Sequence, residues 1–392
     1  MRPLNKTVCG FFSSTLMLAA LTVCGLANAA PQIPVPAPPQ IGATSYILLD
    51  HHSGAVLASQ NVDQQIEPAS ITKLMTSYIV FSELQSGGLN LEEMVPVSEK
   101  AWRTEGSKMF IEVGTQVKAA DLLKGMIVQS GNDASVALAE HIAGSEETFA
   151  ALMNQYAQSL GMNHSNFLNA TGLPAPQHLT TARDIATLSQ AIIRDFPEYY
   201  RWYSEKEFTF NEIRQHNRNN LLWRDPAVDG LKTGHTSAAG YCLAASAQRS
   251  NMRLISVVMG SASENSRADD SQKLLNYGFR FFETHRLYGA DEELSRVKVW
   301  KGETEDLGLG IDADIYITIP SGQYDALRAE TEVMSVLTAP MELGTEVGNL
   351  RVFLDDELKA SAPLLTLNGV QRGGLWRRMS DSIALWFHDF GE

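Results

Sequence analysis

Apolar positions along this chain follow a helical spacing in some segments and a strand spacing in others. Residues 71–81 are mostly apolar with few helix breakers, so they predict a buried helix that begins near Pro68. Helical spacing or helix-start signals occur again at residues 121–129, 133–142, 181–193 and 273–282. Short apolar runs between turn residues predict strands at residues 44–50, 55–59, 241–247 and 254–260. Strands at both ends with helices between them indicate one mixed α+β domain over residues 41–286.

The spacing changes after residue 286. Apolar and polar residues alternate around residues 297–299, 315–319 and 350–354, and glycine, proline and acidic residues break the runs. Alternation of this kind is typical of strands that bury one face. We therefore expect a small all-β domain, a sandwich or a partial barrel, over residues 287–372, without a catalytic group.

Residues 373–392 return to a helical spacing. The apolar residues on one side of this segment are Trp376, Met379, Ile383, Trp386, Phe387 and Phe390. The segment is too short and too charged to span a bilayer, but it fits an amphipathic helix that lies in the membrane interface. Docking on the protein itself or on a partner is the alternative. Gly369, Gly373 and Gly374 detach the segment from the β domain and favour the membrane.

Residues 1–29 have the pattern of a secretory signal peptide. Arg2 and Lys6 precede an uncharged apolar stretch, and Ala27-Asn28-Ala29 supplies small residues for cleavage. Cleavage as a lipoprotein before Cys24 is an alternative that the preceding valine fits poorly. Residues 30–40 then form a stiff extended spacer, with five prolines between positions 31 and 40.

Charge and cysteine content exclude several classes of function. The 31 basic and 45 acidic residues give a formal net charge of −14, which argues against nucleic acid as a partner. Two of the three cysteines lie in the signal segment, so only Cys242 remains and no internal disulfide can form. Cys242 lies in an apolar run and is expected to pack in the core. No group of histidines, cysteines and acids has the spacing of metal ligands, so we expect no metal or other cofactor.

A candidate nucleophile lies at the start of the first helix. Ser70 and Lys73 are three residues apart and therefore lie on one face of the helix. The backbone N–H of Ser70 is free at the helix N-terminus, where the dipole favours a developing oxyanion. Lys73 can remove the Ser70 proton only as a neutral amine, which requires burial or a nearby positive charge. Ser-x-x-Lys alone is more often an ordinary helix surface.

Two further polar motifs follow along the chain. Ser130-Gly131-Asn132 separates two predicted buried helices and could present two polar side chains to a cleft, although a helix cap and turn is the commoner role of such a tripeptide. Lys232-Thr233-Gly234-His235 leads into the later pair of predicted strands.

The three motifs in this order, in an exported chain, resemble the serine penicillin-recognising enzymes, which are the penicillin-binding proteins and the serine β-lactamases. Pro68-Ala69 before the first motif and His235 after the third extend the resemblance. With the β domain and the terminal segment, the whole mature chain resembles a low-molecular-mass penicillin-binding protein of the D-alanyl-D-alanine carboxypeptidase type. The resemblance implies a catalytic domain with an antiparallel sheet and helices.

The resemblance also implies a role for each residue of the first two motifs. Ser70 would attack the carbonyl between the last two D-alanines of a peptidoglycan stem pentapeptide, release D-alanine and form an acyl-enzyme. Lys73 would be the general base, with its pKa lowered by burial and by the charge of Lys232 across the cleft. Ser130 would relay the proton to the leaving amine, and Asn132 would hold the substrate amide.

The third motif would bind the substrate. Lys232 and Thr233 would orient the terminal carboxylate. Gly234 would let the substrate approach this strand closely and pair with it as an added strand. The backbone N–H groups of Ser70 and His235 would form the oxyanion hole.

Two further residues match the family less specifically. Arg218 corresponds to a family arginine near the carboxylate site, although a surface ion pair would also explain it. Class A β-lactamases carry a glutamate that activates water for deacylation, but residues 165–183 contain no acid. Asp184 is the nearest candidate for assisting deacylation, and its position at a helix start in a capping box would explain it equally well. We therefore expect β-lactams to acylate the protein and to leave slowly.

Other functions compete with the carboxypeptidase. A β-lactamase would turn penicillin over rapidly. An endopeptidase for D-alanyl cross-links belongs to relatives that usually lack the β domain and the terminal helix. A catalytically silent penicillin-binding scaffold would have lost a motif residue, and none is lost. The resemblance implies a role in peptidoglycan synthesis and cell shape, and a location in the periplasm, peripherally attached to the outer face of the inner membrane.

Overall fold

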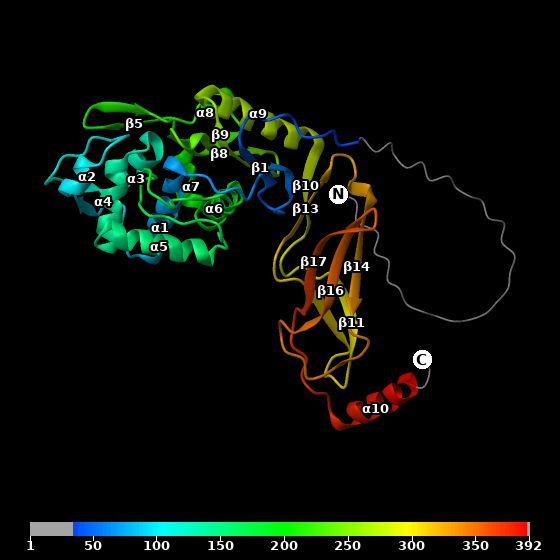
Figure 1. The fold of residues 1–392 in the computed structure, drawn as a ribbon. Coiled ribbons are helices and arrows are strands. Elements are labelled where there is room, and N and C mark those ends of the chain that lie inside the picture. Colours follow the sequence, from blue (N-terminus) through cyan, green and yellow to red (C-terminus); the bar gives the residue numbers. More distant parts are fainter. Residues whose placement is uncertain (1–33, 390–392) are drawn as a thin grey trace. The chain divides into compact units, whose positions relative to one another are not determined.

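The computed structural model describes residues 34–389, which fall into two compact units (Figure 1). One unit is Pro36–Phe281, and the other includes the described chain from Phe282 onward. Each unit has a hydrophobic core of its own. The predicted signal peptide lies outside the described residues, and so does Phe390 of the terminal segment.

A five-stranded antiparallel sheet forms the centre of the first unit. In pairing order its strands are β2 (Val56–Gln60), β1 (Ser45–Asp50), β9 (Met252–Ser261), β8 (Gly240–Arg249) and β7 (Val228–Thr236). The register pairs His235 with Tyr241 across the β7–β8 hairpin. In the described part of the chain no strand pairs with the outer edge of β7, so this edge is open to an extended peptide.

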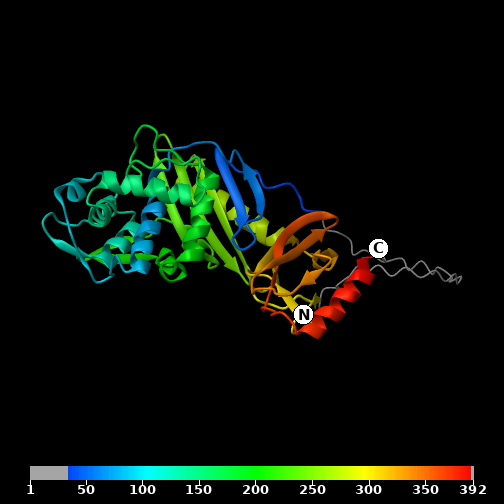
Figure 2. The same ribbon diagram turned by 90° about the horizontal axis from the view of Figure 1, so that it is seen from below.

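Helices cover both faces of this sheet (Figures 1 and 2). The longer helices are α1 (Lys73–Ser86), α4 (Asn132–Ala143), α5 (Glu146–Ser159), α6 (Ala182–Asp195) and α9 (Glu264–Phe281). Successive residues of a strand point to opposite faces. Ile47 and Leu49 accordingly join the buried cluster that contains residues of α1 and α6. Leu48 points to the other face, where it lies against Gly278 of α9.

Shorter elements connect the sheet and the long helices. They are η1 (Ala69–Thr72), β3 (Met94–Pro96), α2 (Glu99–Arg103), β4 (Gln116–Lys118), α3 (Ala119–Lys124), η2 (Gly125–Gln129), α7 (Pro197–Tyr200), η3 (Arg201–Ser204), β5 (Glu207–Phe210), β6 (Ile213–His216) and α8 (Leu221–Arg224). Two of these short elements lie at motifs that the sequence predicts to be catalytic. The first motif begins in the 3-10 turn η1, and the second directly follows the π-helical turn η2.

The second unit confirms the prediction of an all-β fold after the catalytic domain. Its strands are β10 (Phe282–Tyr288), β11 (Ser295–Trp300), β12 (Asp306–Gly310), β13 (Ile315–Pro320), β14 (Leu327–Val333), β15 (Leu337–Thr338), β16 (Glu346–Leu354) and β17 (Glu357–Thr366), with the short helical turn η4 (Tyr324–Ala326). Six strands form one sheet in the order β14-β16-β17-β12-β11-β15, and β10 pairs with β13. In β13 the buried residues alternate with half-buried ones, as the sequence pattern predicts.

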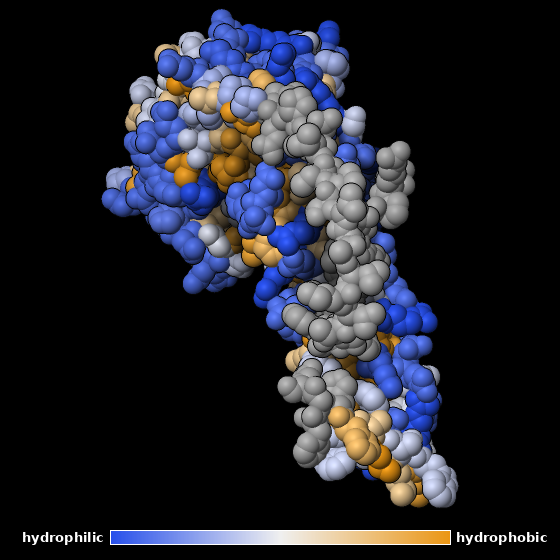
Figure 3. All heavy atoms as spheres, turned by 90° about the vertical axis from the view of Figure 1, so that its right-hand side faces the viewer, coloured by the Kyte–Doolittle hydropathy of each residue, from blue (hydrophilic) through white to orange (hydrophobic). Residues whose placement is uncertain are grey.

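The helix α10 (Leu375–Asp389) follows the strands of the second unit and presents its apolar side to solvent. Trp376 is 86% exposed and Phe387 64% exposed. The polar side faces the connection between β11 and β12 instead, because the Lys301 backbone N–H donates to Asp381 and Arg377 pairs with Glu305. The band of apolar residues at the lower end of Figure 3 belongs to this unit. Over residues 34–389 no helix combines the length and the apolar character needed to cross a membrane.

Candidate active site

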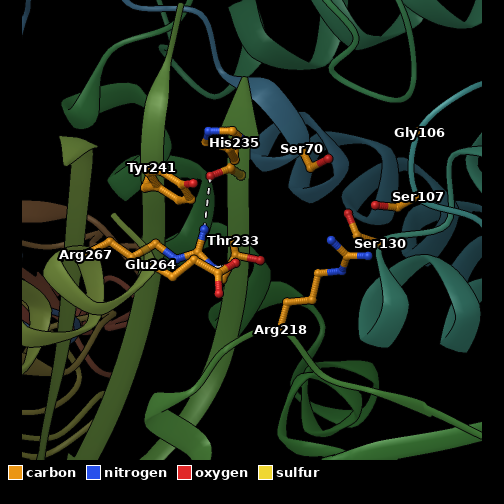
Figure 4. Close-up of a pocket in the computed structure, with 11 residues that line it drawn as sticks. Ser70, Gly106, Ser107, Ser130, Arg218, Thr233, His235, Tyr241, Glu264 and Arg267 are labelled. Carbon is orange, nitrogen blue, oxygen red and sulfur yellow. Dashed lines mark hydrogen bonds and ion pairs between the residues drawn. The ribbon is translucent and has the colours of Figure 1, made fainter. Parts of the chain in front are cut away.

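Ser70 lies in η1, in the wall of a cavity of about 470 Å³ in the first unit (Figure 4). The preceding residue, Ala69, has a φ of +47°, a left-handed conformation that is unfavourable for alanine. A loop packs directly against this strained turn, since a Cβ on Gly172 would lie 1.8 Å from the Ala69 carbonyl oxygen. The contact requires glycine at position 172 and holds the turn that presents Ser70.

The amine of Lys73 connects the first two motifs. Its Nζ lies 3.0 Å from Ser70 Oγ, 2.7 Å from Asn132 Oδ1 and 2.5 Å from the Thr171 carbonyl oxygen. Lys73 is 1% exposed, so these protein groups replace water around the amine. The predicted pairing of a serine hydroxyl with a buried lysine is therefore present in the geometry.

Burial, followed by the positive charge of Arg218, lowers the pKa of Lys73 to about 7, against a weaker opposing effect of Asp133. The sequence correctly predicted that Lys73 is buried, but it indicated Lys232, and not Arg218, as the cation that lowers the pKa of Lys73. Lys232 is itself buried, and burial together with the charge of Lys73 lowers its pKa well below the ordinary value. A neutral Lys73 is thus accessible near neutral pH.

The second motif places one hydroxyl in the cavity and one amide beside it. Ser130 has a φ of +68°, and its buried Oγ has no hydrogen-bond partner in the described part of the protein. Figure 4 shows this side chain directed toward the space in front of Ser70. Asn132 accepts from Lys73, and its Nδ2 donates to the Glu105 carbonyl oxygen at 2.6 Å. In this structure the Asn132 side chain therefore positions the Lys73 amine.

The third motif forms the opposite wall on the open edge of β7. Lys232 is 3% exposed and donates to the Thr233 carbonyl oxygen at 3.1 Å. A Cβ on Gly234 would lie 3.1 Å from the Pro68 carbonyl oxygen and equally close to Ile71. The close approach at Gly234 is thus made by the protein's own nucleophile turn, in addition to any approach by substrate.

Arg218 lies between β6 and α8 and enters the cavity from the side of Ser130 (Figure 4). Its neighbours anchor this segment, because Asn217 donates to the Glu205 carbonyl oxygen and Asn219 to that of Gly230. Within residues 34–389 no carboxylate forms an ion pair with Arg218. The surface ion pair that the sequence left as an alternative is therefore absent, and the guanidinium faces the cavity.

Asp184 does not line this cavity. Its carboxylate accepts from the His164 backbone N–H at 3.0 Å and from Ser165 Oγ at 2.7 Å. Its own backbone N–H donates to Thr181 Oγ1, so Thr181 is the N-cap of α6. In the structure Asp184 thus secures the start of the loop that carries Gly172.

Five residues that the sequence did not single out also line the cavity, namely Gly106, Ser107, Tyr241, Glu264 and Arg267. Tyr241 stacks on His235 with ring centroids 4.0 Å apart. Arg267 lies 5.6 Å from the Tyr241 ring and donates to the Gly234 carbonyl oxygen, the dashed line in Figure 4. Tyr241 could have been identified from the sequence by pairing the strand that contains His235 with the predicted strand that follows it, because Tyr241 then lies opposite His235.

Metal ligation is not a feature of the described residues. Over positions 34–389, the histidine, cysteine and acidic side chains form no group of three or more that could hold a metal ion. Cys242 is a buried free thiol. Burial raises its pKa to about 11, which keeps the thiol protonated and unreactive at neutral pH.

Models of two protein families match this chain. The D-alanyl-D-alanine carboxypeptidase model matches residues 32–263, and the model described as the C-terminal domain of penicillin-binding protein 5 matches residues 282–372. The two matches cover the two units in the order in which they occur along the chain.

Relatives with both units are similar over most of their length. D-alanyl-D-alanine carboxypeptidase DacC of Escherichia coli is 45% identical over 360 residues, which cover 90% of this chain and 90% of that protein. D-alanyl-D-alanine carboxypeptidase DacA of Haemophilus influenzae is 46% identical over 354 residues, covering 89% and 90%. The crystal structure of penicillin binding protein 5 from Haemophilus influenzae matches with a TM-score of 0.83 and 47% identity, over 86% of this chain and 100% of that chain.

Proposed function

The chain belongs to the D-alanyl-D-alanine carboxypeptidase family, and from this premise we propose how its residues perform the reaction. It is a serine-type carboxypeptidase that removes the terminal D-alanine of peptidoglycan stem pentapeptides through an acyl-enzyme, and β-lactams inhibit it covalently. The observation that carries the mechanism is the buried Lys73 amine, 3.0 Å from Ser70 Oγ and without a carboxylate among its hydrogen-bond partners.

Acylation begins with Lys73 in its neutral form. Lys73 accepts the Ser70 proton while Ser70 Oγ attacks the carbonyl carbon of the scissile bond. The backbone N–H groups of Ser70 and His235 stabilise the oxyanion, an effect worth about 3 kcal/mol of barrier per donor in related chemistry. The tetrahedral intermediate then expels the D-alanine amine. The proton passes from Lys73 through the unpartnered Ser130 hydroxyl to the leaving nitrogen.

Cations on one side of the cavity bind the terminal carboxylate of the substrate. Arg218 reaches into the cavity without an ion-pair partner among the described residues, and the hydroxyl of Thr233 lies on the open edge of β7. Lys232 is buried next to Thr233 in the chain, and its amine adds positive charge to this end of the cavity when it is protonated. The carboxylate therefore lies at the Lys232 end of the strand, and the scissile carbonyl lies at the His235 end.

Water completes the cycle by attacking the acyl-enzyme. Lys73 is again the nearest base to the ester oxygen of Ser70. Asp184 contributes by fixing the loop that carries Gly172. The acidic residue that lines the cavity is Glu264, which Arg267 holds at 3.5 Å. Without a free carboxylate beside the ester, a penicilloyl group is expected to leave slowly.

The reaction is tested by measuring D-alanine release from a peptide that ends in D-Ala-D-Ala. We expect release by the wild-type chain, none by Ser70→Ala, and a loss of about 10²- to 10⁴-fold by Lys73→Ala. Equal thermal unfolding of the three proteins shows that the loss is chemical. Release that survives Ser70→Ala would contradict the assignment of the nucleophile.

We further propose that the chain is exported and that α10 binds the outer face of the cytoplasmic membrane. The support is the orientation of α10, whose apolar side is turned to solvent while Asp381 and Arg377 bind the connection between β11 and β12 in its own unit. Exposed aromatic residues on one helix face are typical of insertion at the headgroup level. The membrane is then the surface that covers this face.

A further inference from the structure

A second cavity, of about 410 Å³, lies beyond the last residue of the third motif. Its lining includes Gln64, Gln65 and Glu67 from the segment before the nucleophile turn, and Ser237, Ala238 and Ala239 from the connection between β7 and β8. None of these residues belongs to the three motifs. Small residues from position 238 to 240 leave the space open.

Glu67 is the one charged residue in this lining. It is half-buried and accepts a hydrogen bond from Thr236 Oγ1 at 3.2 Å. Over the described positions 34–389 it has no basic partner. A carboxylate in a cavity without a cation is a receptor for a positively charged group, since the attraction is screened less there than on an open surface.

The position of this cavity matches the path of a bound peptide. A substrate extended along the open edge of β7 places its terminal carboxylate near Thr233 and its scissile carbonyl between Ser70 and His235. At about 3.3 Å per residue, the residue before the D-alanine pair arrives opposite the end of β7 at Thr236. Its side chain is then beside the segment that contains Glu67.

We propose that this cavity is a subsite for a cationic side chain on the residue that precedes the D-alanine pair, with Glu67 as the partner of its amine. The proposal rests on the proposed function and deepens it. Charges at the two ends of the substrate path then have opposite signs, with Arg218 at the carboxylate end and Glu67 at the acyl end. Glu264, the acidic residue of the catalytic cavity, is already held by Arg267.

The test compares two peptides that differ by one charge. They are Nα-acetyl-L-lysyl-D-alanyl-D-alanine with a free ε-amine and the same peptide with this amine acetylated. We expect kcat/KM of the wild-type chain to favour the free amine by about tenfold, which corresponds to about 1.4 kcal/mol. Glu67→Gln should reduce this ratio to about one, and added salt should reduce it in the wild type.

Asp63→Asn is the matched control. Asp63 is an exposed carboxylate a few residues before Glu67, and Arg183 binds it at 2.7 and 3.1 Å. The substitution removes the same charge from the same segment, so a retained preference shows that the effect belongs to Glu67. An unchanged ratio in Glu67→Gln, or no preference in the wild type, would overturn the proposal.

Equilibrium binding separates the subsite from the reaction. Ser70→Ala cannot form the acyl-enzyme, and we expect it to bind the free-amine peptide more tightly than the acetylated one. Equal Kd values would contradict the subsite. A retained difference in Kd, together with no D-alanine release by the wild type, would contradict the proposed function alone.

Discussion

The amine of Lys73 has two side-chain oxygens and one carbonyl oxygen as partners, from Ser70, Asn132 and Thr171. None of these groups carries a negative charge, so burial is not offset by an ion pair and the neutral amine is favoured. A lysine within salt-bridge distance of a carboxylate would stay protonated and could not act as a base. The ability of Lys73 to act as a base thus depends on the absence of a carboxylate from its hydrogen-bond partners.

The pH dependence of acylation follows from this environment. Because the pKa of Lys73 is lowered to about 7 and only the neutral amine is active, kcat/KM should rise as pH increases toward 7 and level off above it. Arg218→Gln removes a positive charge that lowers this pKa, so the midpoint should move to higher pH. A profile measured from about pH 5 to 9 checks both statements. A midpoint that moves down in Arg218→Gln would contradict them.

Tyr241 offers a second prediction at this scale. Its ring stacks on His235, whose backbone N–H is the proposed oxyanion donor. Tyr241→Phe keeps the stack and should keep kcat close to that of the wild type. Tyr241→Ala removes an aromatic pair worth about 1 kcal/mol and should lower kcat by about fivefold with a smaller change in KM. Equal kcat values for the alanine and phenylalanine variants would show that the stack does not position this strand.

At the scale of single residues, the sequence predicts those catalytic contacts that form between residues close together in the chain. Ser70 and Lys73 lie one helical turn apart, and their spacing alone brings them together. Arg267 was not predicted because residues 264–272 carry no apolar periodicity, so α9 was expected to begin near residue 273. That early part of α9 buries Arg267, Asp270 and Ser271 instead. Buried polar residues leave no hydrophobic signal in a sequence.

The nucleophile turn and the loop that packs on it act as one element. The loop contributes the Thr171 carbonyl oxygen to Lys73 and the close contact of Gly172 with Ala69. The loop also contacts the nucleophile turn through His178, whose ring lies 2.9 Å from Thr72 Oγ1. Burial lowers the pKa of His178 to about 4, so this contact persists with a neutral imidazole.

Gly172→Ala tests this coupling. The residue has a φ of +84°, and the added Cβ would lie 1.8 Å from a backbone oxygen that cannot move freely. We expect a loss of about 3 kcal/mol in unfolding free energy and a large loss of acylation rate. Chemical denaturation and penicillin acylation rates measure the two effects.

Gly161→Ala is the control for backbone strain alone. Gly161 has a φ of +77°, but nothing lies within 4 Å of its added Cβ. We expect it to cost about 1–2 kcal/mol in stability and to leave acylation unchanged. If both variants lose the same stability and Gly172→Ala keeps its acylation rate, the loop does not hold the nucleophile turn.

The sequence predicted a helix that ends before Ser130 but not the form of its last turn. Residues 125–129 make a π-helical turn, and Ser130 then adopts a left-handed conformation without being glycine. Such strain is stable only when tertiary contacts impose it. It therefore cannot be predicted from local preference.

At the scale of the whole molecule, the units and their order were predictable because the period of the apolar pattern changes between them. The family prediction, which rested on three motifs in order, is confirmed by the matches to carboxypeptidase relatives. Membrane binding by α10 remains a prediction. The structure adds that the apolar side of α10 is exposed in the described chain.

Removal of residues 375–392 should release the mature chain from anionic lipid vesicles at low salt without changing D-alanine release from a soluble peptide. The reason is that, among the described residues, the apolar side of α10 is exposed to solvent and not covered by its own unit. Trp386→Ser in the full chain should weaken vesicle binding, whereas Ser380→Ala on the same helix should not. Undiminished binding of the truncated chain would contradict the membrane role.

The central claim is that Ser70 forms a covalent acyl-enzyme with Lys73 as its base. Time-resolved intact mass of the mature chain, mixed first with penicillin and then with a D-Ala-D-Ala peptide, tests it most directly. The account predicts a long-lived penicilloyl adduct on Ser70, absent from Ser70→Ala and formed slowly by Lys73→Ala, together with D-alanine release from the peptide. Rapid penicillin hydrolysis without an adduct, or an adduct that persists in Ser70→Ala, would contradict it.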